Sequence, residues 1–192
     1  EVENDVLVAE LYIQREGADP ERLSKDVNQA IDWGVAQAKA QAEVKVQTLG
    51  YQTNPTYRKG EIKGWRVRQA LRLESRDAAV LRSLLGNLQQ RLMIQSVGYQ
   101  VSKDSRRHAE DKLIAEALVN YTQRARAVTK ALGRSGFTLV EIDINTSGMA
   151  PRPVPMMGHR MMAAEAVSAP PTLEAGSQDI KVIVQGTIQL TD

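Results

Sequence analysis

The segment WRVRQALRLE, residues 65–74, constrains the fold more than any other stretch of the chain. Two sets of residues alternate along it: Trp65, Val67, Gln69, Leu71 and Leu73 in one set, and Arg66, Arg68, Ala70, Arg72 and Glu74 in the other. An alternation with a period of two predicts a β-strand, because successive side chains of a strand point to opposite faces. One face is mostly apolar and the other is mostly charged, which is typical of an antiparallel sheet with one side in solvent.

The rest of the chain alternates between strand patterns and helix patterns. Strands are expected over 4–17, 93–103, 137–147 and 177–192, and residues 43–76 are expected to form a hairpin. Pro55 and Gly60 mark the irregular middle of that hairpin, because both residue types interrupt regular strands.

Three helices are expected between the strands. Asp19 and Asp77 are placed to cap the first two, because an aspartate side chain accepts the unpaired N–H groups of a first helical turn. The longest helix is expected to begin at Asp104 or Ser105 and to end near Leu132. Its apolar residues recur at spacings of four and three, and this stripe is expected to be buried against a sheet: Ile114, Leu118, Tyr121, Ala125, Val128 and Leu132.

The order of these elements predicts an α+β fold, a mostly antiparallel sheet with helices packed on one face. We expect a single domain over 1–192, with a long Met/Pro/Ala-rich excursion at 149–176 before the last strand. A chain of 192 residues is long enough to bury a core without help from metals or disulfides.

The composition argues against several classes of function. Cysteine is absent, which excludes disulfides, thiolate nucleophiles and cysteine-based metal sites. The net charge of +2 is too small for a strong field, so no nucleic-acid partner is expected. The sequence also lacks a Gly-x-Ser-x-Gly elbow and a glycine-rich phosphate loop. We therefore expect a protein that is not an enzyme and that uses no cofactor.

The excursion at 149–176 supports two interpretations. Thioether and imidazole ligands suit Cu(I), and the candidate metal ligands are Met156, Met157, His159, Met161 and Met162. Alternatively, the methionines pack adaptably and the prolines keep the segment extended, so that it docks on a neighbouring copy of the chain. The residues of that oligomer interface would be Pro153, Pro155, Met156, Met157, Met161 and Met162.

The basic row within 65–74 is a further candidate. Arg66, Arg68 and Arg72 share one strand face and can contact phosphates or an anionic membrane surface. The other interpretation is an exposed polar sheet face, or a subunit interface, where arginine is enriched. Association with a membrane surface stays open, and no apolar run approaches the ~20 residues needed to cross a bilayer.

Three long segments carry a recognisable pattern: LGYQTNPTYRKGEIKGWRVRQALRLE at 49–74, DKLIAEALVNYTQRARAVTKALG at 111–133, and PRPVPMMGHRMMAAEAVSAPPTLEAGSQDIKVIVQGTIQL at 151–190. Together they resemble the SIMPL-domain family, also called DUF541. The Gly-aromatic pair of that family is present as Gly64-Trp65. The family's PDxA-like element after the first strand is replaced by GADPERLSKD at 17–26, in which the order of Asp and Pro is reversed.

The resemblance implies an exported protein with no established enzymatic activity and a link to stress responses of the cell envelope. It also implies self-association, because at least one member forms a large ring-shaped oligomer with a channel-like hole. The expected location is therefore the periplasm, and the expected partner is a second copy of the chain. The chain begins at Glu1 without an initiator methionine, so we expect a signal peptide to have been removed.

Overall fold

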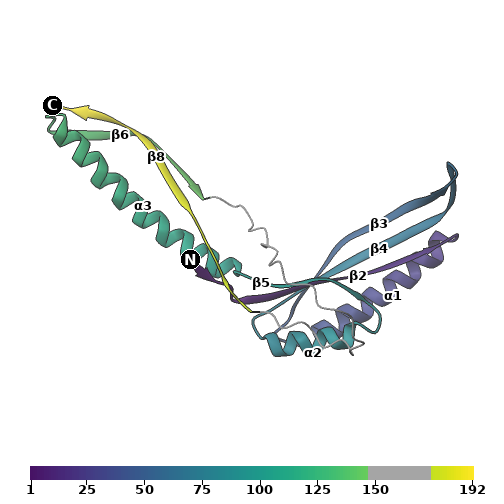
Figure 1. The fold of residues 1–192 in the computed structure, drawn as a ribbon. Helices are drawn as coiled ribbons and strands as arrows, with labels where there is room; N and C mark the ends of the chain where they lie inside the picture. Colours follow the sequence, from purple (N-terminus) through teal and green to yellow (C-terminus); the bar gives the residue numbers. More distant parts are fainter. Residues whose placement is uncertain (147–173) are drawn as a thin grey trace, which may run out of the picture. The chain divides into compact units, whose positions relative to one another are not determined.

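A computed structural model describes residues 1–146 and 174–192 (Figure 1). The described residues fall into two compact units. We call 4–100 with 174–176 the sheet unit, and 1–3, 101–146 and 177–192 the ribbon unit. Both combine helices with antiparallel strands, which confirms the predicted α+β class. The expectation of one domain over 1–192 stays a prediction.

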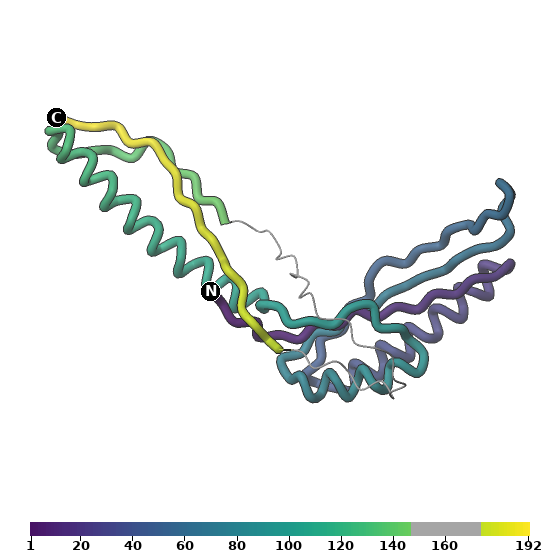
Figure 2. Tube along the Cα trace, viewed as in Figure 1, coloured from purple at the N-terminus to yellow at the C-terminus, as the bar shows by residue number. Residues whose placement is uncertain are grey.

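The sheet unit is built on four antiparallel strands in the order β3-β4-β2-β5. Their bounds are Val6–Gly17 for β2, Lys45–Arg58 for β3, Glu61–Ser75 for β4 and Met93–Gln100 for β5. The first of these strands along the chain, β2, lies between β4 and β5 (Figure 2). The expected strand at 93–103 is therefore present but ends at Gln100.

Two helices, α1 at Pro20–Lys39 and α2 at Ala78–Leu88, cover one face of this sheet. Both predicted N-caps are confirmed, since the carboxylates of Asp19 and Asp77 accept backbone N–H groups of the first turns at 2.9–3.2 Å. Residues from the strands and helices form a common core, which includes Leu7, Leu11, Ile13, Val27, Ile31, Val67, Leu71, Leu73, Leu81 and Leu88. In 65–74, the buried residues Val67, Leu71 and Leu73 all belong to the apolar face that the alternation predicted.

The hairpin expected over 43–76 is formed by β3 and β4, and Gly60 lies in its turn with a φ of 83°. The expectation that Pro55 also interrupts the strands is wrong, because Pro55 lies inside β3 directly opposite Trp65. Since β3 is an edge strand, a residue that has no N–H can be placed there without loss of a ladder hydrogen bond.

The ribbon unit consists of a long helix against a two-stranded ribbon. The helix α3 spans Lys103–Ala131, and the ribbon pairs β6, Gly136–Thr146, with β8, Val182–Thr191. A short antiparallel pair joins β1, Val2–Glu3, to β7, Ser177–Gln178. Ser102 caps α3, slightly before the expected start, and its hydroxyl accepts the backbone N–H of Ser105 at 3.2 Å.

The apolar stripe predicted for the long helix is buried only in part. Ala125 is buried, but Val128 is 43% exposed and Leu132 is 61% exposed. A stripe spaced by four and three repeats every 3.5 residues, so it drifts around a straight helix that has 3.6 residues per turn. Thr129 occupies the buried position instead, and its hydroxyl donates to the carbonyl of Ala125 at 2.8 Å.

Candidate functional site

The predicted row of arginines lies on the face of the sheet unit opposite to the two helices. The register of β2 and β4 places Arg66, Arg68 and Arg72 beside polar residues of β2. The directly opposed pairs are Glu16 with Arg66, Gln14 with Arg68, and Glu10 with Arg72. The sequence therefore predicted that the arginines share a face, but their partners come from a strand that is about fifty or sixty residues away along the chain.

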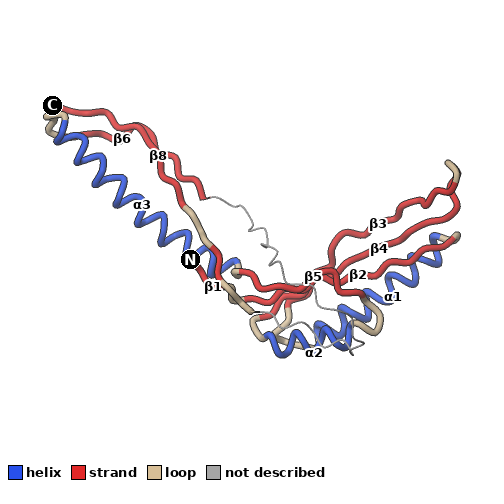
Figure 3. Tube along the Cα trace, viewed as in Figure 1, coloured by secondary structure: helices blue, strands red, loops and turns tan. Residues whose placement is uncertain are grey.

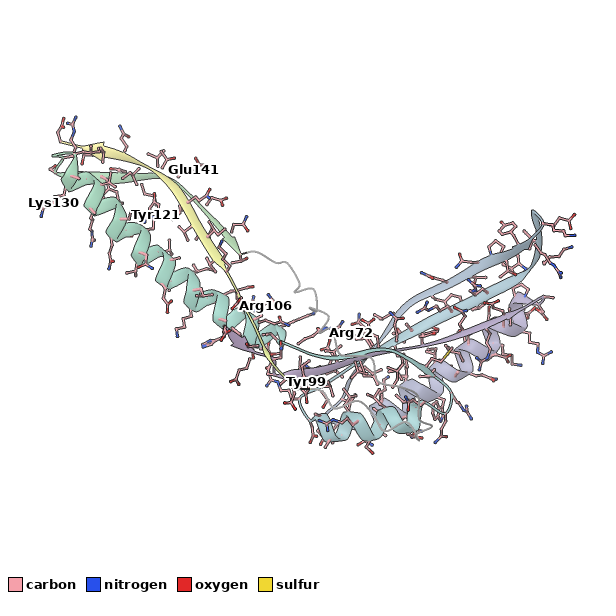
Figure 4. The ribbon with its side chains drawn as sticks, viewed as in Figure 1. Arg72, Tyr99, Arg106, Tyr121, Lys130 and Glu141 are labelled. Atoms are coloured by element: carbon pink, nitrogen blue, oxygen red, sulfur yellow. The ribbon has the colours of Figure 1, made fainter. Side chains whose placement is uncertain are left out.

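Arg72 is the best-connected member of the row. Its guanidinium donates to Glu74 Oε1 at 2.8 Å, to Glu10 Oε1 at 3.4 Å and to Gln100 Oε1 at 3.1 Å. These acceptors come from β4, β2 and β5, so the side chain of Arg72, which is labelled in Figure 4, ties three strands together. The planar guanidinium suits this role because its donors point in several fixed directions.

Arg68 and Arg66 are also engaged. The guanidinium of Arg68 lies over the ring of Tyr12, 4.1 Å from the centroid, and donates to Gln95 Oε1. The Nε of Arg66 donates to Glu16 Oε1 at 2.5 Å, where both side chains are about half exposed. The face is thus a network in which carboxylate and amide oxygens already accept from every arginine of the row.

This network has consequences for the predicted contact with anions. The carboxylates of Glu10, Glu16 and Glu74 compete with any incoming phosphate for the same donors, and the charges of the face nearly balance. A role of Arg66, Arg68 and Arg72 in binding an anionic surface stays a prediction.

The other predicted site residues lie outside the described ranges. They are the interface residues Pro153, Pro155, Met156, Met157, Met161 and Met162, together with His159 of the alternative metal set. Within 1–146 and 174–192, no cluster of three or more His, Asp or Glu side chains is arranged to hold a metal ion. None of the helices in these ranges combines the length and the hydrophobicity that a membrane-spanning segment requires.

The ribbon unit presents a second candidate surface, the edge of β8. The strand sequence VIVQGTIQLT, residues 182–191, contains no charged residue and no proline. In the described part of the chain, β8 pairs with β6 on one side and with no strand on the other. An uncharged edge strand of this length offers its unpaired N–H and C=O groups to another strand.

The edges of the sheet unit differ from that of β8. The edge strand β3 contains Pro55 and Lys45 and has two register shifts against β4. The other edge strand, β5, also has no charged residue and no proline, but it is shorter and carries a bulge at Gln95. The register shift of the β6–β8 pair lies at Val140 of β6 and leaves β8 regular. Prolines, lysines and bulges are the features by which edge strands avoid pairing with other chains, and β8 itself contains none of the three.

The helix of the ribbon unit covers its apolar face incompletely. Because Gly186 of β8 contacts Tyr121 of α3, the residues that share a face with Gly186 point toward the helix. Leu139 and Ile144 of β6 belong to this face, since they pair with Ile188 and Val184. They nevertheless remain 46% and 40% exposed, so part of the apolar face is available for a further contact.

The sequence analysis did not identify the edge of β8 as a candidate surface, although residues 182–191 carry a recognisable pattern. The absence of charge from 182–191 can be read directly, but the position of the strand at a sheet edge depends on the fold.

Comparison with known protein families shows a match over nearly the whole chain. The sequence model of SIMPL, described as a protein of unknown function (DUF541), matches residues 1–188. No curated protein matches the chain.

Proposed function

The chain belongs to the SIMPL family, and from this premise we propose that it is a non-enzymatic, exported protein that assembles with copies of itself. The observation that carries the proposal is the open edge of β8. In the proposed assembly, this edge pairs with a strand of another copy, and the family resemblance supports a ring-like form and a role in cell-envelope stress.

The energetics of the ribbon favour such a contact. A two-stranded ribbon is marginally stable alone and depends on further strands or on packing against a helix. Here α3 packs on the ribbon but leaves part of its apolar face exposed. Each backbone hydrogen bond added across the edge contributes about 1 kcal/mol net, so a paired β8 is stabilised by several kcal/mol.

The geometry of pairing determines the size of the assembly. If β8 pairs with β8 of a second copy, the contact is two-fold and the assembly stops at a dimer. If β8 pairs with a different strand of the next copy, the contact is head-to-tail, and it forms a ring where the rotation between copies closes and an open filament where it does not. The ring implied by the family therefore requires the second arrangement.

The proposal is tested by measuring the mass in solution of a variant that carries added charge on the edge of β8. Gln185 and Gln189 are exposed residues of β8, and the substitutions Gln185→Lys and Gln189→Lys together place two lysines on the strand without touching the core. Lysines on an edge strand oppose pairing, so the double variant is expected to have a smaller mass in light scattering than the unmodified protein.

A matched control uses the same chemistry on another edge. Gln47 and Gln52 are exposed on β3, and changing both to lysine adds equal charge to the sheet unit. This control is expected to keep the mass of the unmodified protein. An equal loss of mass in both double variants would point to a general effect of charge and would contradict the role of β8.

A further inference from the structure

The hairpin of β3 and β4 extends beyond the rest of its sheet. Pairing between β2 and β4 ends at Gly17 with Trp65, whereas β3 and β4 stay paired to Arg58 and Glu61. Residues 56–64 therefore form a projecting hairpin, which we call the tip; it is the free end of the β3–β4 pair in Figure 3.

The base of the tip is closely packed. A Cβ added to Gly64 would lie 2.8 Å from the carbonyl oxygen of Gly17, a distance that real Cβ atoms avoid. Glycine at this position lets the end of β2 approach β4 directly. The close contact between Gly64 and Gly17 thus fixes the base of the tip to the four-stranded sheet.

The tip presents an apolar pair to solvent. Tyr57 and Ile62 are directly opposite across the hairpin, so their side chains share one face. Tyr57 is 64% exposed and Ile62 is 52% exposed, and neither belongs to the core of the sheet unit. Packing among the residues that the structure describes thus leaves more than half of each exposed.

Three cations are neighbours of this pair along the hairpin: Arg58, Lys59 and Lys63. Arg58 and Lys59 form no ion pair with any residue that the structure describes, and Lys63 is paired with Glu61 at 2.9 Å. Lys59 has a positive φ of 53° and Gly60 follows with 83°. A two-residue turn of this kind favours Asn, Asp or Gly at its first position. A lysine there is disfavoured by the backbone, which points to a use for its charge.

We propose that the tip is a contact site for an anionic lipid surface. Tyr57 and Ile62 would enter the boundary between headgroups and acyl chains, where tyrosine is favoured. Arg58 and Lys59 would contact lipid phosphates, since Lys63 already donates to Glu61. This site is separate from the row of Arg66, Arg68 and Arg72, whose donors are already engaged.

The apolar pair favours a membrane over another polyanion. A nucleic acid would use the cations and could stack on Tyr57, but an exposed isoleucine gives a base no flat partner. A bilayer interface accepts both the aromatic ring and the aliphatic side chain.

The expected affinity depends on the number of tips. One cation near an anionic membrane surface raises affinity roughly fivefold, so a single tip binds weakly. Several tips on one assembly bind more tightly by avidity, and in this respect the proposal rests on the proposed self-association. The local contact of one tip does not depend on assembly and is measurable at high lipid concentration.

The test places a fluorescent probe at the tip. The variant Tyr57→Trp is mixed with vesicles of phosphatidylcholine, with or without phosphatidylglycerol, and the parent spectrum is subtracted. We expect a blue shift and quenching by brominated lipid with the anionic vesicles, and a loss of both in high salt. The matched control Tyr51→Trp lies on the same strand about 20 Å away from the tip and is expected to show neither change.

Charge variants complete the test. Changing Arg58 and Lys59 together to glutamine is expected to weaken binding to the anionic vesicles roughly 25-fold, by removal of two cations. An unchanged Tyr57→Trp spectrum with anionic vesicles would overturn the proposal, and so would an equal response from Tyr51→Trp. An equal blue shift with duplex DNA would show a general polyanion contact and would also overturn it. The mass of each preparation is measured in parallel, so a failure of assembly is distinguished from a failure of the lipid contact.

Discussion

Tyr121 on α3, which is labelled in Figure 4, lies directly against Gly186 on β8: a Cβ added to Gly186 would be 2.7 Å from the Oη of Tyr121. The same added atom would lie 2.5 Å from the carbonyl oxygen of Glu141 on β6. The absence of a side chain at Gly186 therefore allows the tyrosine to pack over the ribbon. This contact helps to hold α3 on the face that carries Leu139 and Ile144.

The substitution Gly186→Ala is expected to lower the free energy of unfolding by about 1–3 kcal/mol, because the backbone of β6 must move to accept the methyl group. Urea denaturation followed by circular dichroism measures the change. Gly98 on β5 is the matched control, since an added Cβ there meets nothing within 4 Å. Equal stability of the unmodified protein and Gly186→Ala would contradict the close contact with Tyr121.

The substitution Arg72→Ala is expected to lower the free energy of unfolding by about 1–2 kcal/mol, because Glu10 and Glu74 lose a shared donor. Arg72→Lys is expected to recover only part of this loss, since a single ammonium group cannot reproduce the planar set of donors. Arg82→Ala, at an exposed position of α2, serves as the control. Full recovery by lysine would show that charge alone matters at this position.

The substitution Asp77→Ala is expected to destabilise the protein by about 1 kcal/mol, because its carboxylate caps α2 through two backbone N–H groups. Asp77→Asn keeps the accepting oxygen and is expected to lie close to the unmodified protein. Thermal unfolding of the two variants gives the comparison. Similar losses from alanine and asparagine would mean that the negative charge near the helix start matters more than the cap.

Much of the fold follows from local patterns in the sequence. The alternation in 65–74 predicted which residues of β4 are buried, and Asp19 and Asp77 predicted where two helices begin. These features are local because side-chain direction in a strand and capping in a helix depend on nearest neighbours. Ranges such as 4–17 and 137–147 were close to the observed strands for the same reason.

The two predictions that the structure contradicts failed because they depend on contacts between distant parts of the chain. Pro55 was expected to interrupt β3, but the sheet places this strand at an edge, where proline is accepted. Val128 was expected to be buried, but a stripe that repeats every 3.5 residues drifts off the buried side of an α-helix, so Val128 is exposed and Thr129 is buried. A short window of sequence shows neither the position of a strand in its sheet nor which side of a helix packs against the strands.

The candidate sites show the same division. The shared face of Arg66, Arg68 and Arg72 was predictable, but their acceptors on β2 and β5 depend on strand register. The exposed edge of β8 depends on the two-stranded ribbon that contains it. A sequence pattern identifies which residues share a face, but their contacts with other strands depend on the fold.

The most direct test of self-association is the mass of the unmodified protein in solution over a range of concentrations, measured by sedimentation equilibrium. One copy of the chain has a mass of 21.2 kDa. We expect a mass at least twice this value, which falls when Gln185 and Gln189 are both changed to lysine and is retained when Gln47 and Gln52 are changed. A mass of a single copy at every concentration of the unmodified protein would contradict it.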